Sequence, residues 1–188
     1  MDIKKHFLNH QLVIDSFLNN DKNFESIRKA ADLILGAINS GNKIFSCGNG
    51  GSMCDAMHFA QELSGYFNTK RKALPAICIS DPSYITCVAN DSSFDFIFSR
   101  FLEANGSEND ILLAISTSGN SKNIINAAKE AKNKNIKVVS LSSGIGGGLS
   151  KYSDISICAE SIQTERIQEI HIIIIHSIIS YIEQKLNL

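Results

Sequence analysis

The sequence predicts an α/β protein with a doubly wound parallel sheet flanked by helices. From residue 43 onward, short apolar runs alternate with stretches of helical periodicity, which is the pattern of strands joined by crossover helices. The runs are almost continuously apolar, as expected for parallel strands that are buried on both faces. Two of the runs lead into loops rich in glycine or hydroxyl side chains, and 188 residues suit one domain.

The strands are predicted at residues 43–47, 74–79, 111–115, 137–141 and 155–159. The helices that follow the first strand are predicted at 53–66, a short stretch from 82, 94–104, 121–133 and 164–186. Asp81 followed by Pro82 is typical of a helix start, because aspartate caps the helix and proline fits its first position. Ligands bind parallel sheets at the carboxyl ends of the strands, near the point where strand order reverses. We therefore expect the chemistry just after residues 47, 79, 115 and 141.

Two amphipathic helices, at residues 2–18 and 24–40, are predicted before the first strand. The faces of one small sheet can be covered without both of these helices, so we expect them to pack against another subunit. A helical cap on the domain edge is the alternative. The chain then divides into a helical oligomerisation segment, 1–41, and a main domain, 42–188.

Composition excludes several classes of function. The 18 basic and 19 acidic residues leave a net charge of −1 without a long block of like charge, which argues against a nucleic-acid or membrane surface. The amino-terminal residues lack the apolar stretch of a signal peptide, and the apolar run at 170–179 is too short to span a bilayer. The five cysteines are scattered and form no CxxC pair, which is typical of reduced thiols in a cytoplasmic protein.

The first loop, Cys47-Gly48-Asn49-Gly50-Gly51-Ser52, joins a predicted strand to a predicted helix. Glycines let the backbone approach a ligand, and a helix start offers unpaired N–H groups to an anion such as phosphate. Ser52 can cap the helix or contact the anion. A tight turn with a serine cap is the alternative, because the loop is neither a dinucleotide fingerprint nor a P-loop.

The second loop, Ser116-Thr117-Ser118-Gly119-Asn120-Ser121, also lies between a predicted strand and a predicted helix. Its hydroxyl and backbone N–H groups can bind phosphate without a lysine. Taken alone, the second loop is equally well interpreted as an ordinary serine-rich turn with a helix cap. Two such loops in one chain favour a phosphorylated ligand.

Two helices carry candidate ligands for a metal or substrate. Asp55, His58 and Glu62 lie on the helix after the first loop, and the spacing of His58 and Glu62 puts them on one face. The alternative for this pair is a solvated helix face. The last helix carries Gln168, His171 and His176 among isoleucines, where a polar group must be paired or functional.

Spacing alone favours Gln168 acting together with His171, which lies three residues further along the helix. The alternative is that the histidine is an interior residue, hydrogen-bonded to a backbone carbonyl. Gln168 and His176 lie ~12 Å apart along a helix, so they converge only on something large or across an interface. After the second strand, Asp81 is interpreted as a helix cap. Asp91 has two possible roles, a helix cap or an acceptor of hydrogen bonds from sugar hydroxyls.

These residues resemble the phosphoheptose isomerases, a family with the sugar isomerase (SIS) fold. The resemblance covers nearly the whole chain from residue 42 and rests on both loops and three further segments. The three segments are 55–65 (Asp-Ala-Met-His-Phe-Ala-Gln-Glu-Leu-Ser-Gly), Asn90-Asp91 and 166–171 (Arg-Ile-Gln-Glu-Ile-His). The combination is specific, whereas each loop alone marks only the broader SIS fold.

The resemblance implies an aldose–ketose isomerase that converts D-sedoheptulose 7-phosphate to D-glycero-D-manno-heptose 7-phosphate. This is the first step toward nucleotide-activated heptose for lipopolysaccharide or capsule. It also implies a cytoplasmic homotetramer with active sites at subunit interfaces and one zinc ion per site.

The site residues that the resemblance implies fall into three groups. The phosphate would be held by Ser52, Ser116, Thr117, Ser118 and Ser121. The rest of the substrate would contact Asn49, Gly50, Gly51, Glu62, Asn90, Asp91 and Gln168. The zinc would be held by His58, Glu62, Gln168 and His176, with Glu62 as catalytic base and His176 as acid or ligand. The family thus uses His176 where spacing alone favoured His171.

Three positions depart from the family pattern. Tyr66 stands where the family usually has an arginine, so a cationic contact to the substrate would have to come from Arg71 or a nearby lysine. Ile145 and Glu165 each replace a family aspartate, and neither change is expected to affect catalysis.

The isomerisation requires one base and one acid, because the carbonyl moves from C2 to C1 through an enediol. Glu62 is the only carboxylate beside both the phosphate loop and His58. The alternative is a non-catalytic SIS-domain adaptor that resembles the replication-initiator-associating protein. That adaptor lacks the catalytic glutamate and the second histidine, which this chain keeps as Glu62 and His176.

Overall fold

The computed structural model describes residues 3–144 and 146–186. Ile145 and residues 1–2 and 187–188, at the ends of the two predicted segments 1–41 and 42–188, lie outside the described residues. Five parallel strands form one sheet in the order β2-β1-β3-β4-β5. They are β1 Ile44–Cys47, β2 Ala76–Cys78, β3 Ile111–Ile115, β4 Lys137–Ser143 and β5 Ile155–Ala159. The predicted doubly wound parallel sheet is confirmed, with all five strands in their predicted places.

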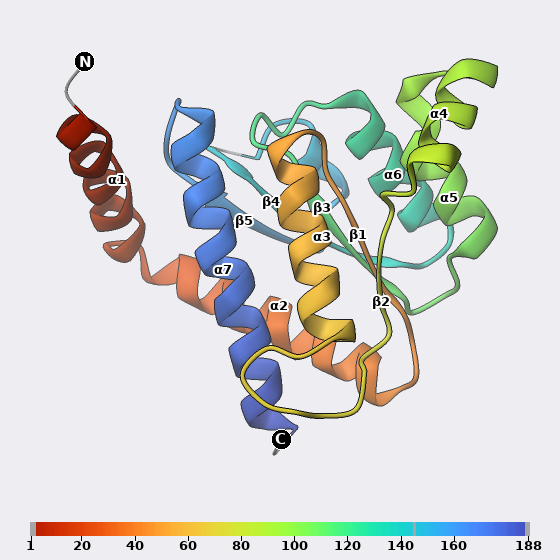
Figure 1. The fold of residues 1–188 in the computed structure, drawn as a ribbon, viewed down its shortest axis with the longest axis horizontal. Coiled ribbons are helices and arrows are strands. Elements are labelled where there is room, and N and C mark those ends of the chain that lie inside the picture. The colour runs from red at the N-terminus through yellow and green to blue at the C-terminus, as the bar shows by residue number, and fades with distance from the viewer. Residues whose placement is uncertain (1–2, 145, 187–188) are drawn as a thin grey trace.

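The helices lie in two layers, one on each face of the sheet (Figure 1). The elements are α1 Ile3–Leu18, α2 Asp21–Asn39, α3 Gly51–Ser64, α4 Pro82–Asp91, η1 Phe94–Phe96, α5 Ile97–Asn105, α6 Lys122–Asn133, η2 Leu149–Tyr152 and α7 Thr164–Lys185. One apolar core joins α2, α3 and α7 to the sheet, and a second core joins α4, α5 and α6 to the opposite face. Alternate residues of a strand face opposite layers, so Leu112 enters one core and Leu113 the other.

The two amino-terminal helices differ in how they pack. α2 buries Ala30, Ala31, Ile34 and Ala37 in the core of its own chain, so it covers the sheet from this side. α1 buries none of its residues and projects at the edge of the molecule beside α7 (Figure 1). The structure thus accounts for α2 within its own chain, whereas α1 contacts α7 and leaves most of its apolar side chains exposed.

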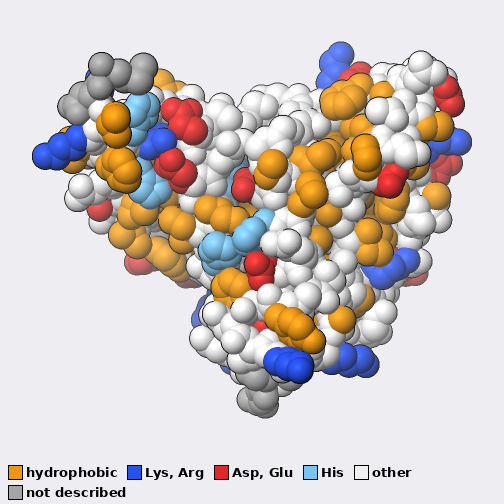
Figure 2. Space-filling view, in the orientation of Figure 1, with side chains coloured by type: hydrophobic (Ala, Val, Ile, Leu, Met, Phe, Trp, Pro, Cys, Tyr) orange, Lys and Arg blue, Asp and Glu red, His pale blue; other side chains and the backbone are white. Residues whose placement is uncertain are grey.

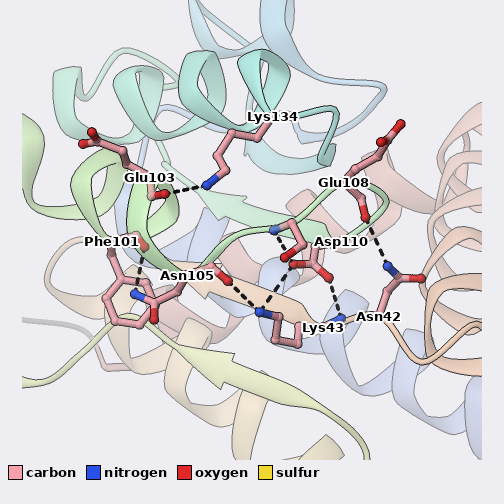
Figure 3. A network of polar contacts seen from close by, with 9 residues as sticks. Asn42, Lys43, Phe101, Glu103, Asn105, Glu108, Asp110 and Lys134 are labelled. Atoms are coloured by element: carbon pink, nitrogen blue, oxygen red, sulfur yellow. Dashed lines mark hydrogen bonds and ion pairs between the residues drawn. The ribbon is translucent and has the colours of Figure 1, made fainter.

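The amino ends of β1 and β3 are tied by a polar network (Figure 3). The buried carboxylate of Asp110 accepts hydrogen bonds from the backbone N–H groups of Lys43 and Ser107, both at 2.8 Å. The ammonium of Lys43 lies 3.9 Å from the same carboxylate and donates to the carbonyl of Asn105 at 2.6 Å. This network fixes the register at one end of the sheet and leaves the carboxyl ends for other chemistry.

Candidate active site

Both hydroxyl and glycine loops lie where the strand order of the sheet reverses. β1 and β3 are neighbours and parallel, and the chain runs outward from them, to β2 on one side and to β4 and β5 on the other. The helices that follow the two strands, α3 and α6, pack on opposite faces. The carboxyl ends of β1 and β3 therefore meet at the switch point where such sheets bind ligands.

The first loop needs its glycines. A Cβ at Gly48 would lie 2.3 Å from the carbonyl oxygen of Ser52, and Gly50, with φ of 55°, begins α3 without a side-chain cap. Ser52 is buried in the first turn of α3. Of the two roles expected for Ser52, the structure does not show the helix cap, because Gly50 holds the cap position and no side chain caps α3. The backbone N–H groups of Ser52 and Met53 donate to the carbonyls of Asn49 and Gly50, at 3.1 and 3.0 Å.

The second loop is ordered by its own hydroxyls and by a third loop. Ser116 donates to the hydroxyl of Ser121 at 3.2 Å, and the backbone N–H of Asn120 donates to the hydroxyl of Ser118 at 3.1 Å. A Cβ at Gly119 would lie 2.2 Å from the carbonyl oxygen of Gly146. The glycine-rich loop after β4 thus packs directly on the second loop, a role for it that the sequence analysis did not foresee.

An amide pair joins the first loop to α6. The amide nitrogen of Asn49 donates to Asn123 at 2.9 Å, and that of Asn123 donates back at 2.8 Å. Asn123 is not among the site residues predicted from the sequence. The feature that could have identified it is that Asn123 is a polar residue on the otherwise apolar, buried face of α6.

The helices α3 and α7 bring three candidate ligands together. The Nε2 atoms of His58 and His176 lie 3.0 Å apart, and His58 Nε2 lies 3.4 Å from Glu62 Oε1. Phe67 stacks on His176 with ring centroids 5.6 Å apart. Figure 2 shows histidine and acidic side chains gathered in the middle of this face, over α3 and α7.

Gln168 takes a different place from these three. Its amide lies against Gly51, where a Cβ would be 2.5 Å from the amide nitrogen. His58 lies seven residues beyond Gly51, ~10 Å along the helix. Gln168 thus lines the first loop. Within the described part of the chain, no group of three or more His, Cys, Asp and Glu side chains stands as a ready-made metal centre.

His171 is an interior histidine. It is fully buried, and its Nε2 lies 3.2 Å from the carbonyl oxygen of Ser142 at the end of β4. Because a carbonyl only accepts, Nε2 carries the proton. Burial lowers the pKa of His171 to about 4, partly offset by this hydrogen bond. Of the two readings that spacing left open, the structure supports the histidine bonded to a backbone carbonyl.

Asp55 lies one helical turn after the first loop and is partly buried. Burial raises its pKa to about 6, and the neighbouring His58 acts in the opposite direction. Its Oδ2 atom is buried and has no hydrogen-bond partner within the described residues. An unpaired, partly buried carboxyl one turn after the first loop is costly for the fold and is typical of a functional site.

The other candidates lie apart from this cluster. Asn90 donates to Asp91 at 2.8 Å at the exposed end of α4, and hydrogen bonds from Asn90 and Cys87 lower the pKa of Asp91. Asp81 caps α4 as predicted, accepting from the N–H of Tyr84 at 2.7 Å.

Arg71 does not take the place of the family arginine. Its guanidinium is buried, pairs with Glu183 at 2.9 Å and donates to carbonyls at the end of α3, including that of Glu62 at 2.6 Å. Tyr66, at the family arginine position, is exposed. The substrate contact assigned to that arginine is therefore not supplied by Arg71 in this arrangement.

Comparison with known proteins agrees with this geometry. The SIS domain family model matches residues 12–143. A phosphoheptose isomerase from Cytophaga hutchinsonii is 54% identical, covering 93% of this chain and 92% of the relative. One from Hamiltonella defensa is 49% identical, covering 94% of this chain and 86% of the relative.

Solved structures agree as well. The phosphoheptose isomerase from Francisella tularensis superposes with a TM-score of 0.92 at 35% identity, over 97% of this chain and 96% of that one. The enzyme from Neisseria gonorrhoeae gives 0.91 at 34% identity, over 97% of both chains. The chain therefore belongs to the SIS-domain proteins and, within them, to the phosphoheptose isomerase family of enzymes.

Proposed function

We propose that this protein converts D-sedoheptulose 7-phosphate to D-glycero-D-manno-heptose 7-phosphate. The observation that carries the proposal is the convergence of His58 and Glu62 on α3 with His176 on α7. The phosphate would lie at the first turn of α3 and at the second loop, among Ser52, Ser116, Thr117, Ser118 and Ser121. The reacting carbons would then extend along α3 toward Glu62.

Glu62 is the proposed base. Side chains on a helix lean toward its amino end, so the carboxylate of Glu62 leans toward the phosphate loops. It removes the proton from C1 of the ketose, the C1–H electrons form the C1=C2 bond, and the C2 oxygen takes a proton. Loss of the C1 hydroxyl proton and return of a proton to C2 then give the aldose.

His58, Glu62 and His176 are of the residue types that bind zinc, although as they lie in this structure they do not form a group of three that could hold a metal. Two imidazoles and a carboxylate are ligands of catalytic zinc, and two ligand atoms of one tetrahedral zinc lie about 3.4 Å apart. The His58 contacts of 3.0 and 3.4 Å are close to that spacing. A zinc held there would polarise the substrate carbonyl. Gln168, beside Gly51, would contact the substrate unless its side chain turned toward the histidines.

His176 has two alternative roles at one atom. As a zinc ligand through Nε2 it has used the lone pair, so it cannot also be a simple acid at that nitrogen. Without the metal, the 3.0 Å contact requires that either His58 or His176 donates an Nε2 proton to the other.

The assembly is part of the same proposal. We expect a homotetramer, because α1 exposes apolar side chains such as Phe7 (73%) and Leu12 (68%) and buries none of its residues. The described residues contain no helix that is long and apolar enough to cross a membrane. A cytoplasmic site is the expectation for an enzyme that acts on a sugar phosphate, and the product would go to lipopolysaccharide or capsule.

The test is incubation of the purified protein with sedoheptulose 7-phosphate in D₂O, with the product identified by NMR. Formation of the aldose with deuterium at C2 supports isomerisation by proton transfer through an enediol. Binding of the sugar phosphate without turnover would instead support the adaptor reading.

A further inference from the structure

Asn49 and Asn123 form a closed pair of amides. Each side chain donates to the other, at 2.9 and 2.8 Å, and Asn123 is only 2% exposed. The Asn123 oxygen also accepts from the backbone N–H of Ile124 at 3.0 Å, which fixes its orientation. Loss of Asn49 leaves buried polar atoms of Asn123 without partners, a cost that exceeds the net value of the bonds themselves.

The amide pair lies at the carboxyl ends of β1 and β3, where the strand order reverses. Asn49 lies in the loop after β1, whose helix α3 packs on one face of the sheet, and Asn123 is the second residue of α6, which packs on the other. The pair is thus a side-chain link between two helix starts that belong to different layers.

Each end of the link lies close in sequence to a proposed phosphate contact. Asn49 lies three residues before Ser52 in the first turn of α3, and Asn123 lies two residues after Ser121, whose hydroxyl accepts from Ser116. The link therefore sets the distance between the start of α3 and the hydroxyls of the second loop. A phosphate that bridges both requires that distance to stay constant.

The bonds to Asn123 also bear on the role of Asn49. Its amide nitrogen and its oxygen are each engaged by Asn123. Each of these atoms keeps one further hydrogen-bonding position, an N–H and a lone pair, for the substrate contact that the family resemblance implies.

We infer that Asn123 is a positioning residue that acts through Asn49 to hold the two phosphate loops at a fixed separation. The inference rests on the proposed phosphate role of the loops. In holding this separation the two residues act as one unit.

A double-mutant cycle of Asn49→Ala, Asn123→Ala and the combined variant tests the inference. The measurements are KM and kcat for sedoheptulose 7-phosphate and the Kd for inorganic phosphate by calorimetry. We expect each single variant to raise KM and Kd roughly tenfold, the order of value of such hydrogen bonds, with kcat changed much less. The combined variant is expected to match the singles, because a pair that acts as a unit is lost only once.

Asn126→Ala is the matched control. Asn126 lies one turn further along α6 and donates to the carbonyl of Asp95 at 3.0 Å, away from the first loop. It is expected to leave KM and Kd unchanged. Asn123→Leu, which keeps the volume, replaces Asn123→Ala if the latter does not fold.

Three outcomes would overturn the inference. They are an unchanged KM and Kd in a folded Asn123 variant, additive effects in the combined variant, and a wild-type protein with no affinity for phosphate. Absence of isomerase activity would reject the proposed substrate. The Kd values for phosphate would still show whether the bond between Asn49 and Asn123 positions the two loops.

Discussion

The Nε2 atoms of His58 and His176 lie 3.0 Å apart although 118 residues separate them in the chain. His58 also contacts Glu62 on the next turn of α3. One chain thus brings together three of the four side chains that the family resemblance assigns to zinc. The interface between subunits is not needed for that part of the site.

Glu62→Gln separates the enzyme from a binding protein. The change is nearly isosteric but removes the base, so kcat is expected to fall by about 10² to 10⁴, with a smaller change in substrate affinity. Gln61→Ala, at the exposed neighbour on α3, is the control and should retain activity. Near-normal turnover by a folded Glu62→Gln protein would exclude Glu62 as the base.

Zinc content of the same Glu62→Gln protein tests the other role of this residue. If Glu62 is mainly a ligand, the purified variant is expected to contain less zinc than wild type, and added zinc should restore part of the activity. Equal zinc content in both proteins, measured by atomic emission, would contradict a ligand role.

Ser118→Ala tests the phosphate assignment. The hydroxyl accepts from the N–H of Asn120 and keeps its own proton for a ligand. Loss of one hydrogen bond to a charged group costs roughly 1.5–3 kcal/mol, so KM is expected to rise about ten- to a hundredfold. Ser83→Ala, at an exposed serine near the start of α4, is the control. If KM is unchanged in both Ser118→Ala and Ser52→Ala, the phosphate binds elsewhere.

Asp55→Asn is expected to stabilise the protein at pH 7. Burial raises the pKa of Asp55 from 3.8 to about 6, so the folded state holds a proton that the unfolded chain loses between these values. The Asp55 contribution to the free energy of unfolding therefore decreases as pH rises from about 4 to about 6. After allowance for partial exposure, the gain from Asn at pH 7 is of the order of 1 kcal/mol.

Denaturant unfolding at pH 4 and pH 7 measures this effect. The difference between Asp55→Asn and wild type is expected to shrink at pH 4, where Asp55 is protonated in the folded state. A difference that is the same at both pH values would show that the pKa of Asp55 is not raised.

Substitution on α1 tests the assembly. Phe7→Asp with Leu12→Asp places charges on exposed apolar positions of a helix that buries nothing in its own chain. Light scattering at micromolar concentration is expected to show a smaller species than wild type. Gln11→Asp, an exposed polar position on the same helix, is the control. A monomeric wild-type protein would reject the tetramer.

The strands and both loops could be predicted from sequence because their signals are local. The apolar runs mark buried strands, and Gly48 and Gly50 mark a turn that other residues cannot make. The cap at Asp81 followed from two adjacent residues, and the structure confirms it. The family resemblance further identified the chain as a phosphoheptose isomerase, in agreement with the comparisons.

Which polar residues meet was decided only by tertiary packing. His171 and His176 both lie among isoleucines, but the rotation of α7 turns His171 toward the carbonyl of Ser142 and His176 toward His58 on α3. The link between Asn49 and Asn123 depends on β1 and β3 being neighbours with their helices on opposite faces. Local periodicity specifies each element and its apolar face, whereas strand order and helix rotation come from burying those faces against one another.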